Sequence, residues 1–305
     1  MTIGFIFPGQ GSQYVGMGKD LYQNFNEVKL VFDEAEEVLE FPLKKICFDG
    51  PESELKQTRY TQPAIFVHSL ATLTLLKNRN INPAVTAGHS LGEYSALVAV
   101  GAISLSDGIR IVRLRAEEMQ KSGEKNPGTM AAIIGLAPED IENICQDAST
   151  AGVVKAANFN SPGQIVISGS IAGVHKAMEL AKLKKARLVT ELVVSGAFHS
   201  PLMQDALDGL TAALDKLDIK NPAVPVYPNV TARPTKNPAE LRDLLKRQLL
   251  SPVLWQDTIQ NMISDGINTF YEIGPGKVLQ NLVKRTDATA KCFSIGKTED
   301  LQFLS

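Results

Sequence analysis

The sequence is poor in cysteine and has no two cysteines placed to share a metal ion. Its 305 residues include only Cys47, Cys145 and Cys292, and no C-x-x-C pair occurs. This spacing excludes the common thiolate metal sites and redox dithiols. A sparse, odd cysteine count is typical of a reducing compartment. We therefore expect a cytoplasmic protein with no metal site.

Long apolar runs and an excess of one charge are also missing. No uninterrupted apolar run approaches the roughly 18 residues of a membrane span. The N-terminal stretch MTIGFIF has no basic region and too short an apolar run for a secretory signal. The 31 basic and 33 acidic residues leave a net charge of −2. Neither a membrane nor a nucleic-acid partner is indicated.

What the sequence does have is the composition of a globular protein. Hydrophobic residues make up 44% of the chain and charged residues 21%, close to the average of folded domains. At about 100–200 residues per domain, the length suggests two structural units with a sizeable core.

The first part of the chain predicts alternating strands and helices. Apolar runs and 3.6-residue periodicity predict strands over residues 2–7 and 84–87, and helices over 19–40, 62–79 and 91–100. This alternation is typical of an α/β fold with a parallel sheet.

The middle of the chain predicts a second unit. Its expected order is strand 129–136, helix 138–149, strands 153–159 and 164–170 joined by NSPG, helix 171–186 and strand 187–195. This βαββαβ order is ferredoxin-like, and its two helices should cover one face of its sheet. We expect a small subdomain, 127–196, inserted into a large domain made of 1–126 and 197–305.

The last part predicts a return to the large domain. We expect a helix over 201–217, a proline-punctuated strand over 222–230, helices within 239–255 that Pro252 interrupts, and a last strand over 268–274.

The strongest chemical motif is GHSLG at residues 88–92. It matches G-x-S-x-G between a predicted strand and a predicted helix, where a sharp turn exposes the serine hydroxyl. Ser90 is then a candidate nucleophile, and the N–H of Leu91 could bind an oxyanion at the helix N-terminus. The alternative is a plain turn with a serine N-cap.

A nucleophilic serine needs a base, and the chain has only four histidines. His68 lies in an apolar helix, His89 should point away from Ser90, and His175 lies on a solvated helix. His199 falls in SGAFHSP, where the small unit returns to the large one, and a cleft is expected there. Elimination favours His199 as the base.

Arg115 is the third unusual residue. In the helix DGIRIVRLRAEEMQ, it flanks an apolar stripe that includes Val112 and Met119, whereas Arg110 faces the polar side. A half-buried guanidinium needs an anionic partner. An internal salt bridge or a side chain that reaches water would satisfy it, and so would a substrate carboxylate.

The loop FPGQGSQ at residues 7–13 is rich in glycine but lacks the Lys-Ser/Thr of a phosphate loop and the spacing of a dinucleotide site. It could instead bring a second oxyanion donor near the serine turn (residues 88–92).

Taken together, these motifs resemble the malonyl-CoA:acyl carrier protein transacylases, the FabD family of acyltransferase domains. The resemblance covers nearly the whole chain and rests on FPGQGSQ (7–13), TQPAIF (61–66), GHSLGEY (88–94), RLRAEEM (113–119), NFNSPGQIVISG (158–169), GAFHSPLM (196–203), RQLLSPVLW (247–255) and EIGPGKVL (272–279). It implies an α/β-hydrolase-like large domain carrying a ferredoxin-like subdomain.

The resemblance also implies roles for individual residues. It implies Ser90 as nucleophile, His199 as general base and later acid, and Arg115 as the clamp for the malonyl carboxylate. The N–H groups of Gln10 and Leu91 would form the oxyanion hole, and the carbonyl of Gln248 would orient the imidazole. Further polar residues that would line the cleft are Asn158, Asn160 and Gln62.

The activity implied is ping-pong transfer of malonyl from malonyl-CoA to the phosphopantetheine thiol of holo acyl carrier protein, for fatty-acid or polyketide synthesis. The enzyme is expected to be a monomer without a cofactor beyond its coenzyme A thioester substrate. The resemblance leaves open the pathway, the tolerance for methylmalonyl and the carrier's docking surface.

Two other functions remain open. A serine thioesterase or esterase would need an acidic third member, for which Asp107, Asp140, Asp147 and Glu191 are available. A non-catalytic module that docks the carrier would need no nucleophile. The basic residues Lys182, Lys184, Lys185 and Arg187 could contact an acidic carrier or form a solvated helix face.

Overall fold

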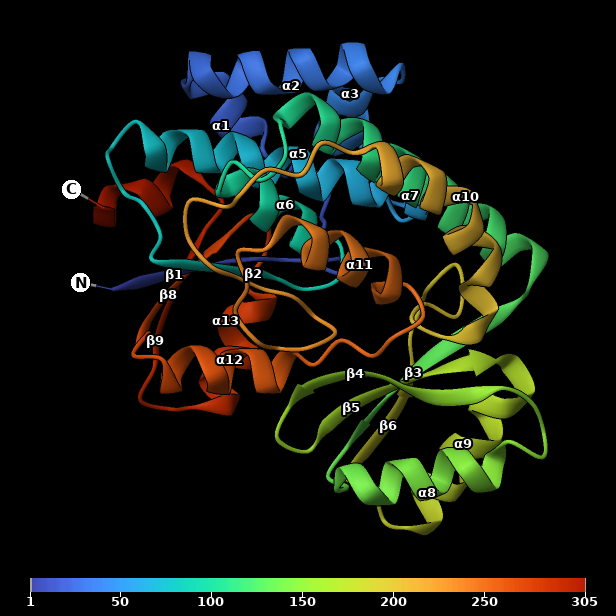
Figure 1. Ribbon diagram of the computed structural model, residues 1–305. Coiled ribbons are helices and arrows are strands. Elements are labelled where there is room, and N and C mark those ends of the chain that lie inside the picture. The colour runs from blue at the N-terminus through green and yellow to red at the C-terminus, as the bar shows by residue number, and fades with distance from the viewer. Residues whose placement is uncertain (1, 305) are drawn as a thin grey trace.

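The computed structural model of the chain describes residues 2–304. The outer limits expected for the large domain, residues 1 and 305, lie outside this range. The named strands form two separate sheets, one of five strands and one of four (Figure 1). This arrangement confirms the predicted α/β class with a parallel sheet and a second, smaller sheet.

The larger sheet is parallel and has β1 at its centre. Its strands, in spatial order, are β7 (Val226–Tyr227), β2 (Val85–Gly88), β1 (Ile3–Phe7), β8 (Thr269–Ile273) and β9 (Lys291–Ile295). β1 is apolar throughout because both of its faces are covered: Phe5 and Phe7 join one core cluster and Ile6 joins the other. Since β1 and β2 are neighbours, their C-terminal loops lie side by side.

Helices cover both faces of this sheet. The first core cluster contains residues from α1 (Lys19–Asn24), α2 (Asn26–Leu39), α3 (Leu43–Asp49), α4 (Glu52–Leu55), α5 (Thr58–Lys77), α6 (Gly92–Ala99), α7 (Leu105–Lys125), α10 (Gln204–Lys216) and α11 (Pro238–Gln248). The second contains α12 (Trp255–Ser264) and α13 (Val278–Thr286). Figure 1 shows α5 to α7 on one side and α12 with α13 on the other.

The longest helices belong to this globular core. α7 has 21 residues and α5 has 20. Among residues 2–304, no helix combines the length and the hydropathy needed to cross a bilayer.

The smaller sheet is antiparallel, in the order β4 (Val154–Ser161), β5 (Gln164–Ser170), β3 (Gly128–Ile134) and β6 (Leu188–Glu191). With α8 (Pro138–Ala148) and α9 (Ile171–Leu183), it has the ferredoxin-like order predicted from the sequence. Both helices pack on the same face, as expected, and share one core cluster with the strands (Figure 1).

Two backbone hydrogen bonds join β4 of the smaller sheet to the segment before α12 in the large domain. Phe159 in β4 donates its N–H to the carbonyl of Val253 (2.9 Å), and Val253 donates to Ala157 (2.9 Å). Val253 belongs to the segment just before α12, whose residues pack under the larger sheet. This pairing fixes the C-terminal half of β4 beside the large domain.

Three expected elements differ from the structure. The helix expected over 19–40 is two helices, because Phe25 between them is extended with φ −131°. The strand expected over 222–230 is only Val226–Tyr227, since its prolines donate no N–H to a ladder. The expectation that 268–274 is the last strand is wrong, because β9 follows it. β9 reads KCFSI and lies at the sheet edge, half exposed, without the long apolar run of a central strand.

Two boundaries also moved. The strand expected over 187–195 ends at Glu191, and after a last backbone bond from Leu192 to Met130 of β3 the segment continues toward His199. The helix expected over 201–217 begins as the 3-10 turn η1 (Pro201–Met203). A second such helix, η2 (Thr298–Leu304), follows β9.

Candidate active site

The serine turn closes only because its two glycines lack a side chain. Ser90 has a left-handed backbone with φ 51°. A Cβ on Gly88 would lie 1.9 Å from the carbonyl carbon of Gly92, and one on Gly92 would lie 2.0 Å from the oxygen of Phe7. The strained turn presents the hydroxyl of Ser90 at the C-terminal end of β2.

Ser90 and His199 are brought together from positions 109 residues apart. Oγ of Ser90 lies 2.8 Å from Nε2 of His199. Nδ1 of His199 lies 2.9 Å from the carbonyl oxygen of Gln248, so this nitrogen carries the proton and Nε2 is free to accept one. Burial, followed by the nearby charge of Arg115, lowers the pKa of His199 to about 3.

A carbonyl therefore occupies the place of an acidic third member. Of the carboxylates considered from the sequence, Asp107 bonds to Ser104, Asp140 pairs with Lys184, and Glu191 bonds to Thr129 and His175. Asp147 is exposed. The acid-containing triad of a typical serine hydrolase is not formed with any of them.

Arg115 is completely buried next to Ser90. Its Nη2 donates to Oγ of Ser90 (3.1 Å) and to Oε1 of Gln248 (3.0 Å). Its Nη1 donates to Oε1 of Gln62 (2.6 Å). Within residues 2–304 it makes no salt bridge, and its Nε–H has no acceptor. The internal ion pair considered as an alternative is thus not present.

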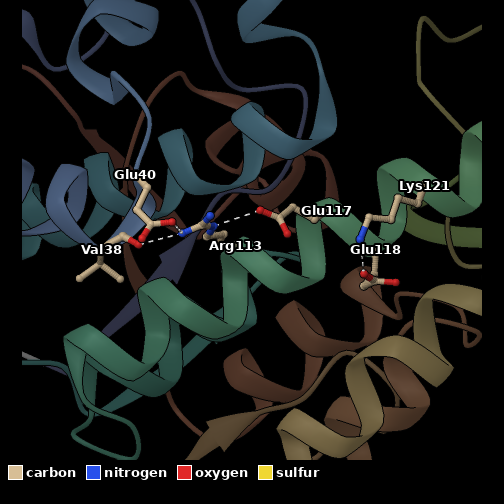
Figure 2. A network of polar contacts seen from close by, with 6 residues as sticks. All are labelled: Val38, Glu40, Arg113, Glu117, Glu118 and Lys121. Atoms are coloured by element: carbon tan, nitrogen blue, oxygen red, sulfur yellow. Dashed lines mark hydrogen bonds and ion pairs between the residues drawn. The ribbon is translucent and has the colours of Figure 1, made fainter.

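The neighbouring arginine shows what an ordinary arginine on α7 does. Figure 2 shows Arg113 between Glu40 and Glu117, in a network of partly exposed ion pairs. Two residues further along the helix, Arg115 faces the opposite way and contacts only neutral acceptors and the ring of Tyr94. A buried cation without a carboxylate is costly unless a ligand supplies one.

The glycine-rich loop after β1 lies against the serine turn, as the sequence predicts. A Cβ on Gly9 would lie 2.4 Å from the carbonyl oxygen of His89. The side chain of Gln10 is anchored by a bond from Nε2 to Oγ1 of Thr58 (3.2 Å). In the described chain, no acceptor is found for the backbone N–H of Gln10 or of Leu91, so both are free to bind an oxyanion.

A cavity of about 150 Å³ opens onto Ser90. The predicted cleft residues all line it, and the complete lining is Gln10, Gln62, His89, Ser90, Leu91, Met119, Met130, Asn158, Asn160, Val166, Leu192, Val194, Phe198 and His199. Arg115 and Gln248 lie directly behind this wall, each bonded to Ser90. Loops after β1 and β2 of the larger sheet and strands of the smaller sheet both contribute to the lining, so the site lies between the two units.

The other histidines differ in their surroundings. His68 is fully buried in α5, and burial lowers its pKa to about 4. His89 packs on Trp255, with ring centroids 5.5 Å apart. It also bonds to Oδ1 of Asn160 (2.9 Å) and lines the cavity, a position that sequence reasoning missed. His175 is half exposed and bonds to Glu191.

The basic residues at the end of α9 are exposed, but they lie away from the cavity. Arg187 donates its backbone N–H to Ile134, whereas Leu192 donates to Met130 at the cavity. β3 and β6 are antiparallel between these two contacts. The cluster therefore lies at the far end of this strand pair.

Two residues behind the cavity wall were also not predicted from the sequence, Asn229 and Glu93. Asn229 bonds to both sides of the serine turn, accepting from the N–H of Ser90 (2.7 Å) and donating to the carbonyl of Gly88 (2.6 Å). Glu93 is fully buried behind it. A carboxylate inside the apolar helix after GHSLG was the available signal for Glu93. Asn229 had none, because its position depends on a distant loop.

No group of three or more histidine, cysteine or acidic side chains within residues 2–304 is arranged to hold a metal ion.

Comparison with known proteins identifies the family. Residues 4–300 match the model of the acyl transferase domain. The chain is 45% identical over 301 residues to the malonyl CoA-acyl carrier protein transacylase of Bacillus subtilis, covering 98% of this chain and 95% of that protein. It is 42% identical to the enzyme of that name from Escherichia coli K12, covering 92% and 91%.

Solved structures agree with this match. An acyl carrier protein S-malonyltransferase from Vibrio cholerae superposes with a TM-score of 0.96 at 41% identity, over the full length of both chains. A malonyl-transacylase solved in complex with a type II polyketide synthase acyl-carrier protein gives a TM-score of 0.96 at 38% identity, covering 99% of this chain and 98% of that one. The chain therefore belongs to the acyl transferase domain family, among its FabD-type members.

Proposed function

We propose that this protein transfers malonyl groups from malonyl-CoA to the phosphopantetheine thiol of holo acyl carrier protein. The observation that carries the proposal is the placement of Ser90 Oγ between His199 Nε2 (2.8 Å) and the buried guanidinium of Arg115 (3.1 Å). The first contact supplies a base and the second a partner for an acyl group that ends in a carboxylate. The named relatives and the carrier complex of a structural neighbour support it.

In the first half-reaction, His199 takes the proton of Ser90, and Oγ attacks the thioester carbonyl carbon. The backbone N–H groups of Gln10 and Leu91 stabilise the tetrahedral oxyanion, and one such donor typically contributes about 10²–10³ in rate. The C–S bond then breaks, and the coenzyme A thiolate takes the proton from His199. A malonyl ester of Ser90 remains.

The second half-reaction runs the same steps in reverse. The carrier thiol gives its proton to His199, and its sulfur attacks the ester carbonyl. The Ser90 alkoxide leaves and recovers the proton, and malonyl departs as a thioester of the carrier. The thioester already activates the acyl carbon, so these steps need no further cofactor. Every group belongs to one chain, and we propose the monomer as the working unit.

Arg115 supports selection for malonyl over neutral acyl groups. With a carboxylate bound, its charge is paired; with acetyl, it stays buried and unpaired. Phe198, which lines the cavity beside His199, would add to this selection by limiting space around the acyl group.

The test is the mass of the intact protein after brief mixing with malonyl-CoA. We expect a malonyl adduct that Ser90→Ala abolishes and that holo acyl carrier protein, but not water, rapidly discharges. An adduct that hydrolyses at the same rate with or without the carrier would identify a thioesterase. If no adduct forms on the wild-type protein, a docking role without catalysis replaces this proposal.

A further inference from the structure

Glu93 is a fully buried carboxylate in the first turn of α6, just after the serine turn. Its Oε2 accepts hydrogen bonds from the backbone N–H of Asn229 (2.9 Å) and from Nε2 of Gln248 (2.9 Å). The steps proposed for acyl transfer do not use it. A buried carboxylate is costly, so its retention needs an explanation.

Both partners of Glu93 hold the reacting groups. Asn229 bonds to both sides of the serine turn. Gln248 donates from Nε2 to the carbonyl oxygen of Ser90 (3.0 Å) and accepts at Oε1 from Arg115 (3.0 Å). Its backbone carbonyl accepts from His199 (2.9 Å). Gln248 thus contacts Ser90, His199 and Arg115 together.

The carboxylate of Glu93, together with the carbonyl of Ser90, sets which way the amide of Gln248 faces. A carboxylate only accepts hydrogen bonds, whereas an amide has one accepting end and one donating end. Because Glu93 and the carbonyl of Ser90 both accept from Nε2, the Oε1 end must face Arg115. If the amide were reversed, two N–H donors would face each other and the guanidinium would lose an acceptor.

The negative charge of Glu93 also lies near the buried Arg115. Burial raises the pKa of Glu93 to about 7, while the bonds from Asn229 and Gln248 and the charge of Arg115 favour the ionised form. Above about pH 7, where Glu93 is mainly ionised, its charge offsets the buried guanidinium in the absence of substrate, although Glu93 forms no direct bond with Arg115.

We propose that Glu93 is the positioning residue for acyl selectivity: acting through Gln248, it holds the guanidinium of Arg115 toward Ser90. This inference rests on the proposed malonyl transfer. It assigns selectivity to an interaction behind the cavity wall, which no lining residue would reveal.

The test compares Glu93→Gln with wild type for acylation of Ser90 by malonyl-CoA and by acetyl-CoA. The variant keeps the shape but loses the charge and the fixed acceptor. We expect kcat/KM for malonyl to fall about 10- to 100-fold, mainly through KM, which is the range of a lost bond to a charged group. Acetyl, which has no carboxylate for Arg115 to bind, should fall less than malonyl, so the malonyl-to-acetyl ratio falls.

Glu272→Gln is the matched control. Glu272 is also fully buried and accepts bonds from the N–H groups of Leu279 (2.9 Å) and Gln280 (2.8 Å) and from Oγ of Ser294 (3.2 Å), but it caps α13. Its loss should lower stability and leave the malonyl-to-acetyl ratio unchanged. If both variants change the ratio alike, or neither does, the inference is wrong.

A second variant covers the case in which Glu93→Gln does not fold. Glu93→Asp keeps the charge and should retain most of the malonyl preference at a higher KM. A folded Glu93→Asp that treats malonyl and acetyl as wild type does, with unchanged KM, overturns the inference. If the wild-type protein itself forms no malonyl adduct, the proposed function fails, whatever the variants do.

Discussion

At the scale of single residues, the hydroxyl of Ser90 is the point where every functional contact meets. It donates toward Nε2 of His199 (2.8 Å) and accepts from Arg115 (3.1 Å). The tautomer of His199 follows from the carbonyl of Gln248 at Nδ1. Because that acceptor is a backbone group, no acidic residue takes this place, and the side chains of the sequence could not reveal it.

The neutral state of His199 leads to the first prediction. Burial and the charge of Arg115 lower its pKa to about 3, from an ordinary value near 6.5. We expect the ring resonances of His199, assigned by comparison with His199→Ala in NMR spectra, to stay constant between pH 8 and pH 5. A titration with a midpoint near pH 6.5 would contradict the inferred environment.

Sequence reasoning was strongest for residues inside contiguous motifs. Ser90 and His199 were predicted as partners, and the structure brings them together. The sequence alone could not show that Arg115 has only neutral acceptors, because Gln62 and Gln248 lie 53 and 133 residues from it along the chain. Asn229 was missed for the same reason, since it lies 139 residues from Ser90.

At the scale of elements, the serine turn depends on the close approach of α6 to the loop after β1. We expect Gly92→Ala to destabilise the protein by about 3 kcal/mol, because its Cβ would lie 2.0 Å from the oxygen of Phe7. Gly101→Ala is the control: it has φ +71° but open space around it, so only backbone strain of about 1 kcal/mol is expected. Urea unfolding of both variants provides the comparison, and equal losses would refute the steric argument.

The helix that carries Arg115 begins at a capping serine. Oγ of Ser104 accepts from the N–H of Asp107 (3.1 Å) at the start of α7. Ser104→Ala should lower the free energy of unfolding by about 1 kcal/mol, the usual contribution of an N-cap. Ser149 is at the C-terminal end of another helix, α8, where its hydroxyl donates to the carbonyl of Gln146. Ser149→Ala should lower the free energy of unfolding by less than Ser104→Ala does. Chemical denaturation measures both, and a larger loss for Ser149→Ala would contradict the assignment.

Elements could be predicted where local pattern and tertiary environment agree. The sequence of β1 is apolar because the strand is buried on both faces, which made it predictable. The βαββαβ order predicted for the smaller unit is the order in the structure. β9 and the break at Phe25 could not be predicted. Pairing with β8 makes the short, half-polar KCFSI a strand, and packing rather than local propensity divides α1 from α2.

At the scale of the whole molecule, the site exists because two sheets enclose one cavity. β4 pairs with Val253 beside the larger sheet, and this brings Asn158 and Asn160 to the wall opposite the serine turn. The residues that line the cavity come from distant parts of the chain, from Gln10 to His199. This is why sequence reasoning could name Asn158, Asn160 and Gln62 only through the family resemblance.

Several buried histidines couple the stability of the whole fold to pH. His68 has a pKa lowered to about 4 by burial, so the unfolded chain binds its proton more readily between pH 4 and 6.5. Stability therefore falls as the pH falls through this window, by about 3 kcal/mol for His68 at pH 4. His199, whose pKa is also lowered, likewise makes the fold less stable as the pH falls. Glu93, whose pKa is raised to about 7, makes the fold more stable as the pH falls.

We expect His68→Gln to flatten this dependence relative to wild type. The measurement is the free energy of unfolding in urea at pH 7 and at pH 4.5, where comparison with wild type isolates the contribution of His68. An identical pH dependence in the two proteins would show that His68 does not stay neutral in the fold.

The decisive experiment for the whole scheme is competition between malonyl-CoA and acetyl-CoA for Ser90. Wild-type protein and Arg115→Met are mixed briefly with an equimolar mixture, and the adducts are resolved by intact mass, with Ser90→Ala as the blank. We predict that malonyl dominates on the wild-type protein and that Arg115→Met loses this preference, because the buried cation no longer distinguishes a carboxylate from a methyl group. Equal labelling of wild-type Ser90 by both donors, or an unchanged preference in Arg115→Met, would contradict charge-selected acyl transfer at this site.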